Sequence, residues 1–183
     1  MRLDHVIYGT TDLDAAAAHI EATLGLPVQP GGHHEGQGSH NKIVPLGPGY
    51  LELLAIDDPQ EAAASPIGRI LQEVITDDGL LAYAVFVDDI ERFGLTVHSV
   101  SRGGLTASVA GVEEALREPF LPFFVSTDRP RMWPAGLGLT WVEVAGDAAR
   151  LRDWLHGGEL PIRVVDGDPA VRALGIGARE YRP

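Results

Sequence analysis

The sequence predicts an α+β fold in which strand–helix modules pair and curl around a shared concave face. Three observations support this prediction. The first 56 residues read as strand, helix and three strands, and the opening plan of strand, aspartate and helix recurs at Leu80 and near Gly138. A module of this size cannot bury its sheet face alone, so the modules are expected to pack together. Paired modules leave a concave face between them, where ligand pockets commonly form.

The first module is predicted over residues 1–57. Residues 3–9 (LDHVIYG) are rich in β-branched and aromatic side chains, which indicates a strand. Asp12 can cap a helix whose apolar positions follow helical spacing as far as Leu24, and Gly25 supplies its end. The module is completed by a short strand near 27–29, a polar, glycine-rich loop over 30–39, and strands at 41–46 and 50–56 that are separated by the turn Gly47-Pro48-Gly49.

The remaining residues are predicted to form a less regular half of the same compact domain. Residues 58–78 read as a linker and a short helix that begins at Pro66, and residues 79–183 form the second half. When the segment LLAYAVFVDDIERF is aligned with the opening of the chain, Asp89 takes the position of Asp12. A strand followed by a helix is therefore expected there. Further strands are expected at 120–127 and, as a short pair, within 160–183.

Composition and charge exclude several classes of function. There are 14 Lys+Arg against 26 Asp+Glu, a net charge of −12, so a nucleic-acid partner is not expected. Cysteine is absent, which excludes disulfides, thiolate metal sites and cysteine nucleophiles. The sequence has no signal-peptide pattern and no uncharged apolar run of membrane-spanning length, so a cytoplasmic protein without a membrane partner is expected. Serine-hydrolase, phosphate-loop and dinucleotide-binding motifs are also absent.

Three polar residues of the first module are candidates for chemistry. His5 and Glu52 each interrupt an apolar strand, and Ile7 and Leu54 share their respective faces because side chains alternate along a strand. A polar residue on an apolar face is a candidate for the lining of a pocket. His40 enters the next strand directly from the glycine-rich loop. Two imidazoles and a carboxylate match the ligand set of non-haem iron and of catalytic zinc.

Ordinary structural roles remain open for the same residues. Glu52 could face solvent on an edge strand, His5 could donate to a backbone carbonyl in the core, and His40 could cap the end of a loop. His33 and His34 could belong to a lid that touches substrate, but exposed loop histidines are commoner and are the expectation here. No local motif such as H-E-x-x-H fixes a metal geometry.

The segment LDHVIYGTTDLDAAAAHIEATLGLPVQPGG, followed by GSHNKIVPLGPGYLELLAI, resembles the opening of the glyoxalase-like domains of the vicinal oxygen chelate (glyoxalase/bleomycin resistance/dioxygenase) superfamily. LPFFVSTDRP more weakly resembles a second-module strand of that group. The resemblance implies paired βαβββ modules in a cup-shaped mixed sheet flanked by helices. It also implies that His5 and Glu52 occupy the first-module metal positions, with a divalent Zn, Fe, Mn, Ni or Mg ion. Such sites bind vicinal oxygens of a substrate.

The second half departs from the pattern expected of such a metal enzyme. The recurring plan places Ala82 and Thr140 where His5 stands, and Ser126 stands where a carboxylate is sought. Glu143 is the best remaining candidate for a ligand from this half. Either His40 completes a three-ligand site within the first module, or the site is metal-free, as it is in the resistance and sequestration members of the superfamily.

The leading hypothesis is therefore a divalent-metal-dependent enzyme, a lyase, isomerase or dioxygenase, that acts on a small oxygen-rich organic substrate. Its metal ligands would be His5, His40 and Glu52, and Glu52 would also be catalytic. The alternative is a metal-free small-molecule binding or drug-sequestering protein of the bleomycin-resistance type, and a catalytically silent partner domain is a third reading. Superfamily members are often homodimers, although two modules can close a cup within one chain. Substrate contacts are expected from Tyr50, Phe124, Ser126, Arg129 and Trp133.

Overall fold

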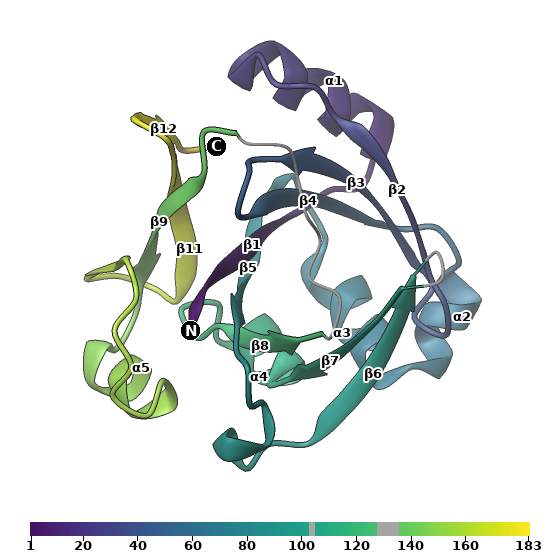
Figure 1. Cartoon of the computed structure of the whole chain (residues 1–183). Helices are drawn as coiled ribbons and strands as arrows, with labels where there is room; N and C mark the ends of the chain where they lie inside the picture. Colours follow the sequence, from purple (N-terminus) through teal and green to yellow (C-terminus); the bar gives the residue numbers. More distant parts are fainter. Residues whose placement is uncertain (103–104, 128–135) are drawn as a thin grey trace.

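The computed structural model describes residues 1–102, 105–127 and 136–183, which form two sheets and several short helices (Figure 1). In chain order the elements are β1 (Arg2–Gly9), α1 (Leu13–Leu24), β2 (Gln29–His34), β3 (Ser39–Pro45), β4 (Tyr50–Ile56), α2 (Pro59–Ala64), α3 (Pro66–Val74), β5 (Gly79–Phe86), the 3₁₀ turn η1 (Glu91–Phe93), β6 (Val97–Arg102), β7 (Leu105–Ala110), α4 (Val112–Arg117), β8 (Phe123–Ser126), β9 (Leu139–Ala145), α5 (Ala148–Trp154), β10 (Ile162–Val165), β11 (Ala170–Ile176) and β12 (Arg179–Tyr181).

The larger sheet confirms the predicted paired modules and their cup shape. Its strand order is β2-β3-β4-β1-β5-β8-β7-β6, so each half places its first strand at the centre of the sheet. β1 runs parallel to β4 and antiparallel to β5, and β5 runs parallel to β8. The sheet curls until its two edge strands, β2 and β6, come into contact (Figure 1). The concave face is thereby enclosed on most sides.

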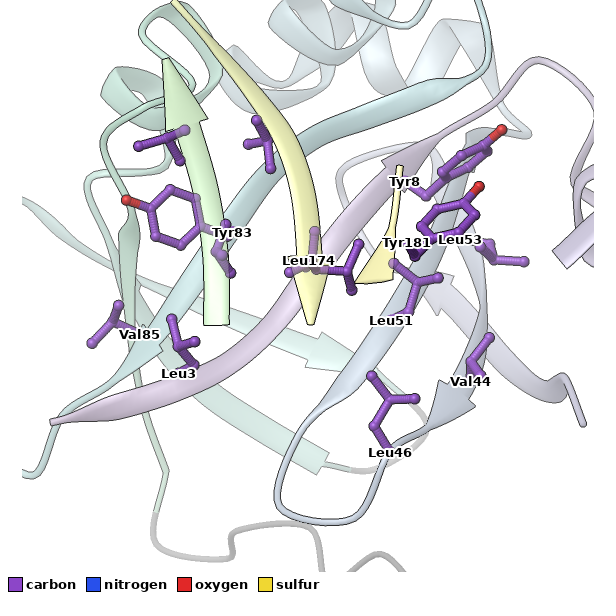
Figure 2. Close-up of a cluster of buried hydrophobic side chains, with 14 of the residues drawn as sticks. Leu3, Tyr8, Val44, Leu46, Leu51, Leu53, Tyr83, Val85, Leu174 and Tyr181 are labelled. Atoms are coloured by element: carbon purple, nitrogen blue, oxygen red, sulfur yellow. The ribbon is translucent and has the colours of Figure 1, made fainter. Parts of the chain in front are cut away.

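The convex face of the curled sheet is covered by the smaller sheet, β10-β9-β11-β12. Tyr8 of β1 lies beside Tyr181 of this C-terminal sheet, and Leu3 and Leu174 belong to the same buried cluster (Figure 2). All four side chains are buried. Because side chains alternate along a strand, the neighbours of these β1 residues point to the opposite, concave face. β1 is therefore buried on both faces.

The predicted ends of the first helix are confirmed. The carboxylate of Asp12 accepts hydrogen bonds from the backbone N–H groups of Asp14 and Ala15, which caps the start of α1. Gly25 ends the helix in the left-handed conformation, with φ of 65°. No helix in the part of the chain that the structure describes is long and apolar enough to cross a membrane.

Several predicted elements differ from the structure. The predicted loop over residues 30–39 is reduced to a turn at 35–38, because residues up to His34 pair with β3 as an edge strand, where Pro30 is tolerated. The linker contains the helix α2, and only a 3₁₀ turn follows Asp89. Strands β6 and β7 and helix α4 were not predicted. The last strands form a separate sheet with β9 instead of extending the cup.

Candidate functional site

A cavity of about 190 Å³ lies between the concave face of the large sheet and the helices α3 and α4. Most of its walls are aliphatic or aromatic. The polar part of its lining is concentrated on the first-module strands β1 to β4, where two histidines and two acidic residues meet. The residues of this polar cluster that line the cavity are Asp4, His5, His34, Ser39 and Glu52.

Glu52 is the centre of the polar cluster. It is only 5% exposed, and its strand β4 lies between β3 and β1, so the carboxylate points into the concave face. Its Oε2 atom lies 3.4 Å from Nε2 of His5. Its Oε1 atom accepts a hydrogen bond from Nδ2 of Asn41 and lies 3.6 Å from Nε2 of His34. The carboxylate is therefore buried among polar partners, as a buried charge requires.

Asn41 has a defined amide orientation. The backbone N–H of Gly32 donates to Oδ1 of Asn41 at 2.9 Å, so the amide nitrogen must be the atom that faces Glu52. The same nitrogen lies 3.3 Å from Nε2 of His34. Nδ1 of His34 lies 2.9 Å from Oγ of Ser39.

A bulge in β2 produces this arrangement. Pro30 pairs with Lys42 and His33 pairs with His40, so one extra residue is accommodated at Gly31-Gly32. The bulge brings the Gly32 N–H onto Asn41. A Cβ atom at Gly31 would lie 1.9 Å from Oδ1 of Asn41 and 2.4 Å from the Asn41 carbonyl oxygen. Only glycine fits at this position.

His5 is held by a second carboxylate. A bulge in the pairing of β1 with β5 falls between Leu3 and His5, and both Asp4 and His5 line the cavity. Nδ1 of His5 lies 2.9 Å from Oδ2 of Asp4, and the His5 ring stacks on Tyr50 with centroids 4.5 Å apart. Burial alone would raise the pKa of Asp4, but hydrogen bonding and charge from His5 and Arg2 outweigh it and lower that pKa. An ionised Asp4 accepts the Nδ1 proton of His5 and leaves Nε2 facing Glu52.

The polar cluster fits two ligand positions of a divalent ion. Ligating histidines characteristically donate their other ring N–H to a carboxylate, which is the relation between His5 and Asp4. Two ligand atoms with bonds of about 2.0–2.2 Å to a tetrahedral ion lie roughly 3.4 Å apart, and Nε2 of His5 and Oε2 of Glu52 have that spacing. Within the described ranges, no group of three His, Cys, Asp or Glu side chains is arranged to hold a metal ion.

The structure does not bring His40 to His5 and Glu52. His40 lies on the face of β3 opposite to Asn41, where its side chain is 37% exposed and Nδ1 is 3.8 Å from Oδ2 of Asp57. It therefore borders a different surface hollow, together with His33. Strand alternation explains this, because the two neighbours of His40, Ser39 in the cavity lining and Asn41 beside Glu52, have the opposite parity. The imidazole near Glu52 belongs instead to His34, and the expectation that His34 is exposed is wrong.

The predicted substrate contacts divide into three groups. Tyr50 lines the cavity, as expected. Phe124 does not, because it is fully buried on the convex side and stacks on Phe93 with centroids 3.8 Å apart. Ser126 shares the parity of Phe124 and is also not part of the lining. Arg129 and Trp133 lie outside the described residues.

The second half contributes apolar walls at the positions that mirror the polar cluster. Ala84 pairs with both His5 and Phe123, and Ala82 pairs with Ile7. Phe123 also packs edge-on against His5, with ring centroids 5.4 Å apart. Glu143, the ligand candidate from this half, belongs to β9 of the smaller sheet and pairs with Arg182 at 2.8 Å. It does not belong to the cavity lining.

Comparison with known proteins identifies the family and the fold. A family model described as a glyoxalase-like domain matches residues 3–157. No curated protein matches the chain. A hypothetical protein from Staphylococcus aureus has 15% identity and a TM-score of 0.71, with 99% of this chain and 97% of that chain covered.

Two methylmalonyl-CoA epimerase structures are also similar in fold. The Streptomyces coelicolor enzyme (Q60A), in complex with 2-nitronate-propionyl-CoA, has 22% identity and a TM-score of 0.51, with 70% of this chain and 99% of that chain covered. The Mycobacterium tuberculosis enzyme has 21% identity and a TM-score of 0.50, with 69% and 86% covered. At these identities the likeness concerns the fold alone.

Proposed function

Because the chain belongs to the glyoxalase-like domain family, as the match over residues 3–157 shows, we propose that it is a divalent-metal-dependent enzyme. Its substrate would be a small oxygen-bearing organic molecule bound in the cavity on the concave face. The reaction would be a proton transfer next to a carbonyl group, in the lyase or isomerase class. The methylmalonyl-CoA epimerases of similar fold are consistent with that class.

The observation that carries this proposal is the pairing of His5 with Glu52 at the polar end of the cavity. Nε2 of His5 and Oε2 of Glu52 are 3.4 Å apart, and each side chain is supported from behind, by Asp4 and by Asn41 respectively. Side chains that are locked by such supporting hydrogen bonds are suited to hold a reacting group in a fixed geometry. Interior strands carry both residues, which adds rigidity.

His5 and Glu52 would hold the ion, with remaining positions left to water and substrate. A divalent ion supplies Lewis acidity, which polarises a carbonyl oxygen. Glu52 would bind the ion through Oε2 and would take and return the substrate proton at Oε1, which the amide of Asn41 orients. Asp4 would keep His5 oriented, and the surrounding aliphatic walls would exclude water, which strengthens electrostatic interactions within the site.

A metal-free small-molecule binding protein is the second candidate. It is favoured by the second-half strands, whose positions around His5 carry Ala84 and Phe123 and offer no further ligand. In this case His5 and Glu52 would donate and accept hydrogen bonds with the ligand directly. The metal content of the purified protein separates the two candidates.

The test is elemental analysis by mass spectrometry on protein purified without a histidine tag, before and after loading with Mn, Fe, Ni and Zn. Wild type, His5→Ala, Glu52→Gln and His40→Ala would be compared, with circular dichroism to verify folding. His40→Ala is the matched control, because this histidine lies on the other face of β3. The expected result is one ion per chain in the wild type and in His40→Ala, and none in the other two variants.

Three outcomes contradict the proposal. Retention of the ion in both His5→Ala and Glu52→Gln would show that these residues do not hold it. The absence of an ion in the wild type under every loading condition would instead favour the binding protein. Loss of the ion in His40→Ala alone would move the metal to the outer face of β3.

A further inference from the structure

The cavity is chemically one-sided. Its polar cluster lies on strands of the first module, whereas the opposite walls are mostly hydrocarbon side chains from the second module and from α3 and α4, with Thr106 and Thr127 as polar exceptions. These walls belong to a continuous apolar cluster that also forms the core beneath the concave face. Representative wall residues are Leu71 on α3, Leu116 on α4, Ala107 and Val109 on β7, and Val125 on β8.

The electrostatics of the described lining do not favour a polyanionic ligand. Arg2 is the one Lys or Arg side chain that the described residues contribute to the lining. Its guanidinium already lies 3.3 Å from Asp4 and 3.2 Å from the carbonyl oxygen of Pro48, and it stacks over Phe86 at 4.4 Å. Asp4 and Glu52 add negative charge to the same region, and the whole chain carries a net charge of −12. Anionic groups would be repelled from this region.

The size of the cavity limits the substrate further. An apolar cavity of about 150 Å³ is large enough to hold benzene. The cavity here, at about 190 Å³, is somewhat larger, so one six-membered ring or a short branched chain fits within it.

We propose that the substrate of this site is a small, uncharged molecule with a hydrocarbon body, aryl or branched alkyl, and a carbonyl or enol function at one end. The carbonyl end lies against His5 and Glu52, and the body lies between α3, α4 and the strands β7 and β8. This inference rests on the proposed function, since it uses the same cavity. It separates the chain from a coenzyme A thioester substrate, whose body is long and polyanionic.

The test is isothermal titration of the full chain with three probes that share an acetoacetyl group. Methyl acetoacetate has a minimal body, benzyl acetoacetate has an aromatic hydrocarbon body, and acetoacetyl-CoA has a polyanionic body. Burial of the phenyl ring should tighten binding by about tenfold or more relative to the methyl ester. Acetoacetyl-CoA is expected to bind no more tightly than the methyl ester.

Two substitutions test where the hydrocarbon body of the ligand binds. Ala107→Phe fills the apolar end without touching the polar cluster, so it should abolish the advantage of the benzyl ester and leave methyl acetoacetate binding within about twofold. Ala149→Phe is the matched control, because Ala149 is exposed on α5, outside the cavity lining. It should leave the binding of all three probes at the wild-type level.

The outcomes distinguish this inference from the proposed function. Equal affinities for the two esters in the wild type, or tightest binding of acetoacetyl-CoA, would overturn the hydrocarbon-body inference. If benzyl acetoacetate still bound more tightly than methyl acetoacetate in Ala107→Phe, the assigned position of the hydrocarbon body would be overturned. Glu52→Gln and His5→Ala should weaken both esters by the same factor. Unchanged ester binding in those variants would overturn the proposed function. The ratio of the affinities of the two esters would still test the hydrocarbon-body inference.

Discussion

Asn41 on β3 donates its amide N–H to Oε1 of Glu52 on β4, and this contact orients the buried carboxylate of the cavity. In the register of the two strands Ile43 is directly opposite Glu52, so Asn41 is its diagonal neighbour on the same face. The amide oxygen is held in turn by the Gly32 N–H. A chain of hydrogen bonds therefore runs from the backbone of β2 through β3 to the functional group on β4.

Replacing Asn41 with leucine should lower the free energy of unfolding by about 1–3 kcal/mol, because Glu52 and the Gly32 N–H would lose a buried partner. The measurement is urea unfolding at neutral pH. Lys42→Leu is the matched control on the outer face of β3, because its ion pair with the exposed Asp14 is screened by solvent and contributes little to stability. An equal loss in the free energy of unfolding in the two variants would show that the Asn41 contacts contribute no more than the exposed Lys42 pair.

Gly31→Ala should destabilise the protein by about 2 kcal/mol or more and reduce metal uptake, since the new Cβ would collide with Asn41. Part of the collision is with the Asn41 backbone, so side-chain rotation alone cannot relieve it. Gly79→Ala is a suitable comparison, because a Cβ there meets nothing within 4 Å. Thermal unfolding and metal analysis of both variants provide the test. A Gly31→Ala protein with wild-type stability and metal content would contradict the described fit of β2 against β3.

Asp4→Asn should weaken metal binding by about 10–100-fold, the usual effect of losing the carboxylate behind a ligating histidine. The variant keeps the shape of the side chain but removes the charge that fixes the Nδ1 proton of His5. Zinc affinity can be measured by competition with a chromophoric chelator. Asp57→Asn is the control, since this carboxylate acts on His33 outside the cavity. If the two variants bound zinc equally well, Asp4 would have no role in positioning His5.

His33 should stabilise the protein in a pH-dependent way. Its Nδ1 atom pairs with Asp57 at 3.1 Å and its Nε2 atom with Glu61 at 2.8 Å. The hydrogen bond to Asp57, with the further effect of Glu61, raises the pKa of His33 above its ordinary value of 6.5. The charged form is favoured in the folded state, so this stabilisation is complete below pH 6.5 and is lost as the pH rises through the raised pKa.

The corresponding experiment is urea unfolding of wild type and His33→Gln at about pH 5.5 and about pH 8.5. The difference in stability between the two proteins should be larger at the lower pH. His19→Gln, at an exposed position on α1 and outside the ion pairs of the described residues, should show no such dependence. If the difference in stability between wild type and His33→Gln grew with pH, the assigned ion pairs would be contradicted.

Much of the first module could be predicted because its residues follow simple periodicities. His5 and Glu52 were found because each interrupts an alternating apolar strand, and both line the cavity. The same rule, applied to Lys42, predicts the face of β3 to which His40 points. Lys42 is two residues further along β3 and must face solvent, so His40 shares its outward face.

His34 and Asp4 were missed for a different reason. A bulge shifts the alternation by one residue, and neither the bulge at Gly31-Gly32 nor the one near Asp4 follows from local propensity. The paired glycines ahead of two histidines were the available signal for the first bulge. In the second half, β6 and β7 pair with each other as a hairpin, and this hairpin joins the sheet through the pairing of β7 with β8 and the contact of β6 with β2, which intrinsic propensity does not encode.

The placement of the polar cluster on β1 and β4 has a consequence for local opening. These strands are flanked on both sides by other strands, so their amide hydrogens should exchange with solvent only when most of the molecule unfolds. The hydrocarbon walls come from α3, α4 and β7, nearer the periphery, where opening costs less free energy. Sequence drift can therefore reshape what the protein recognises while the groups that would perform the reaction stay on its most slowly exchanging part.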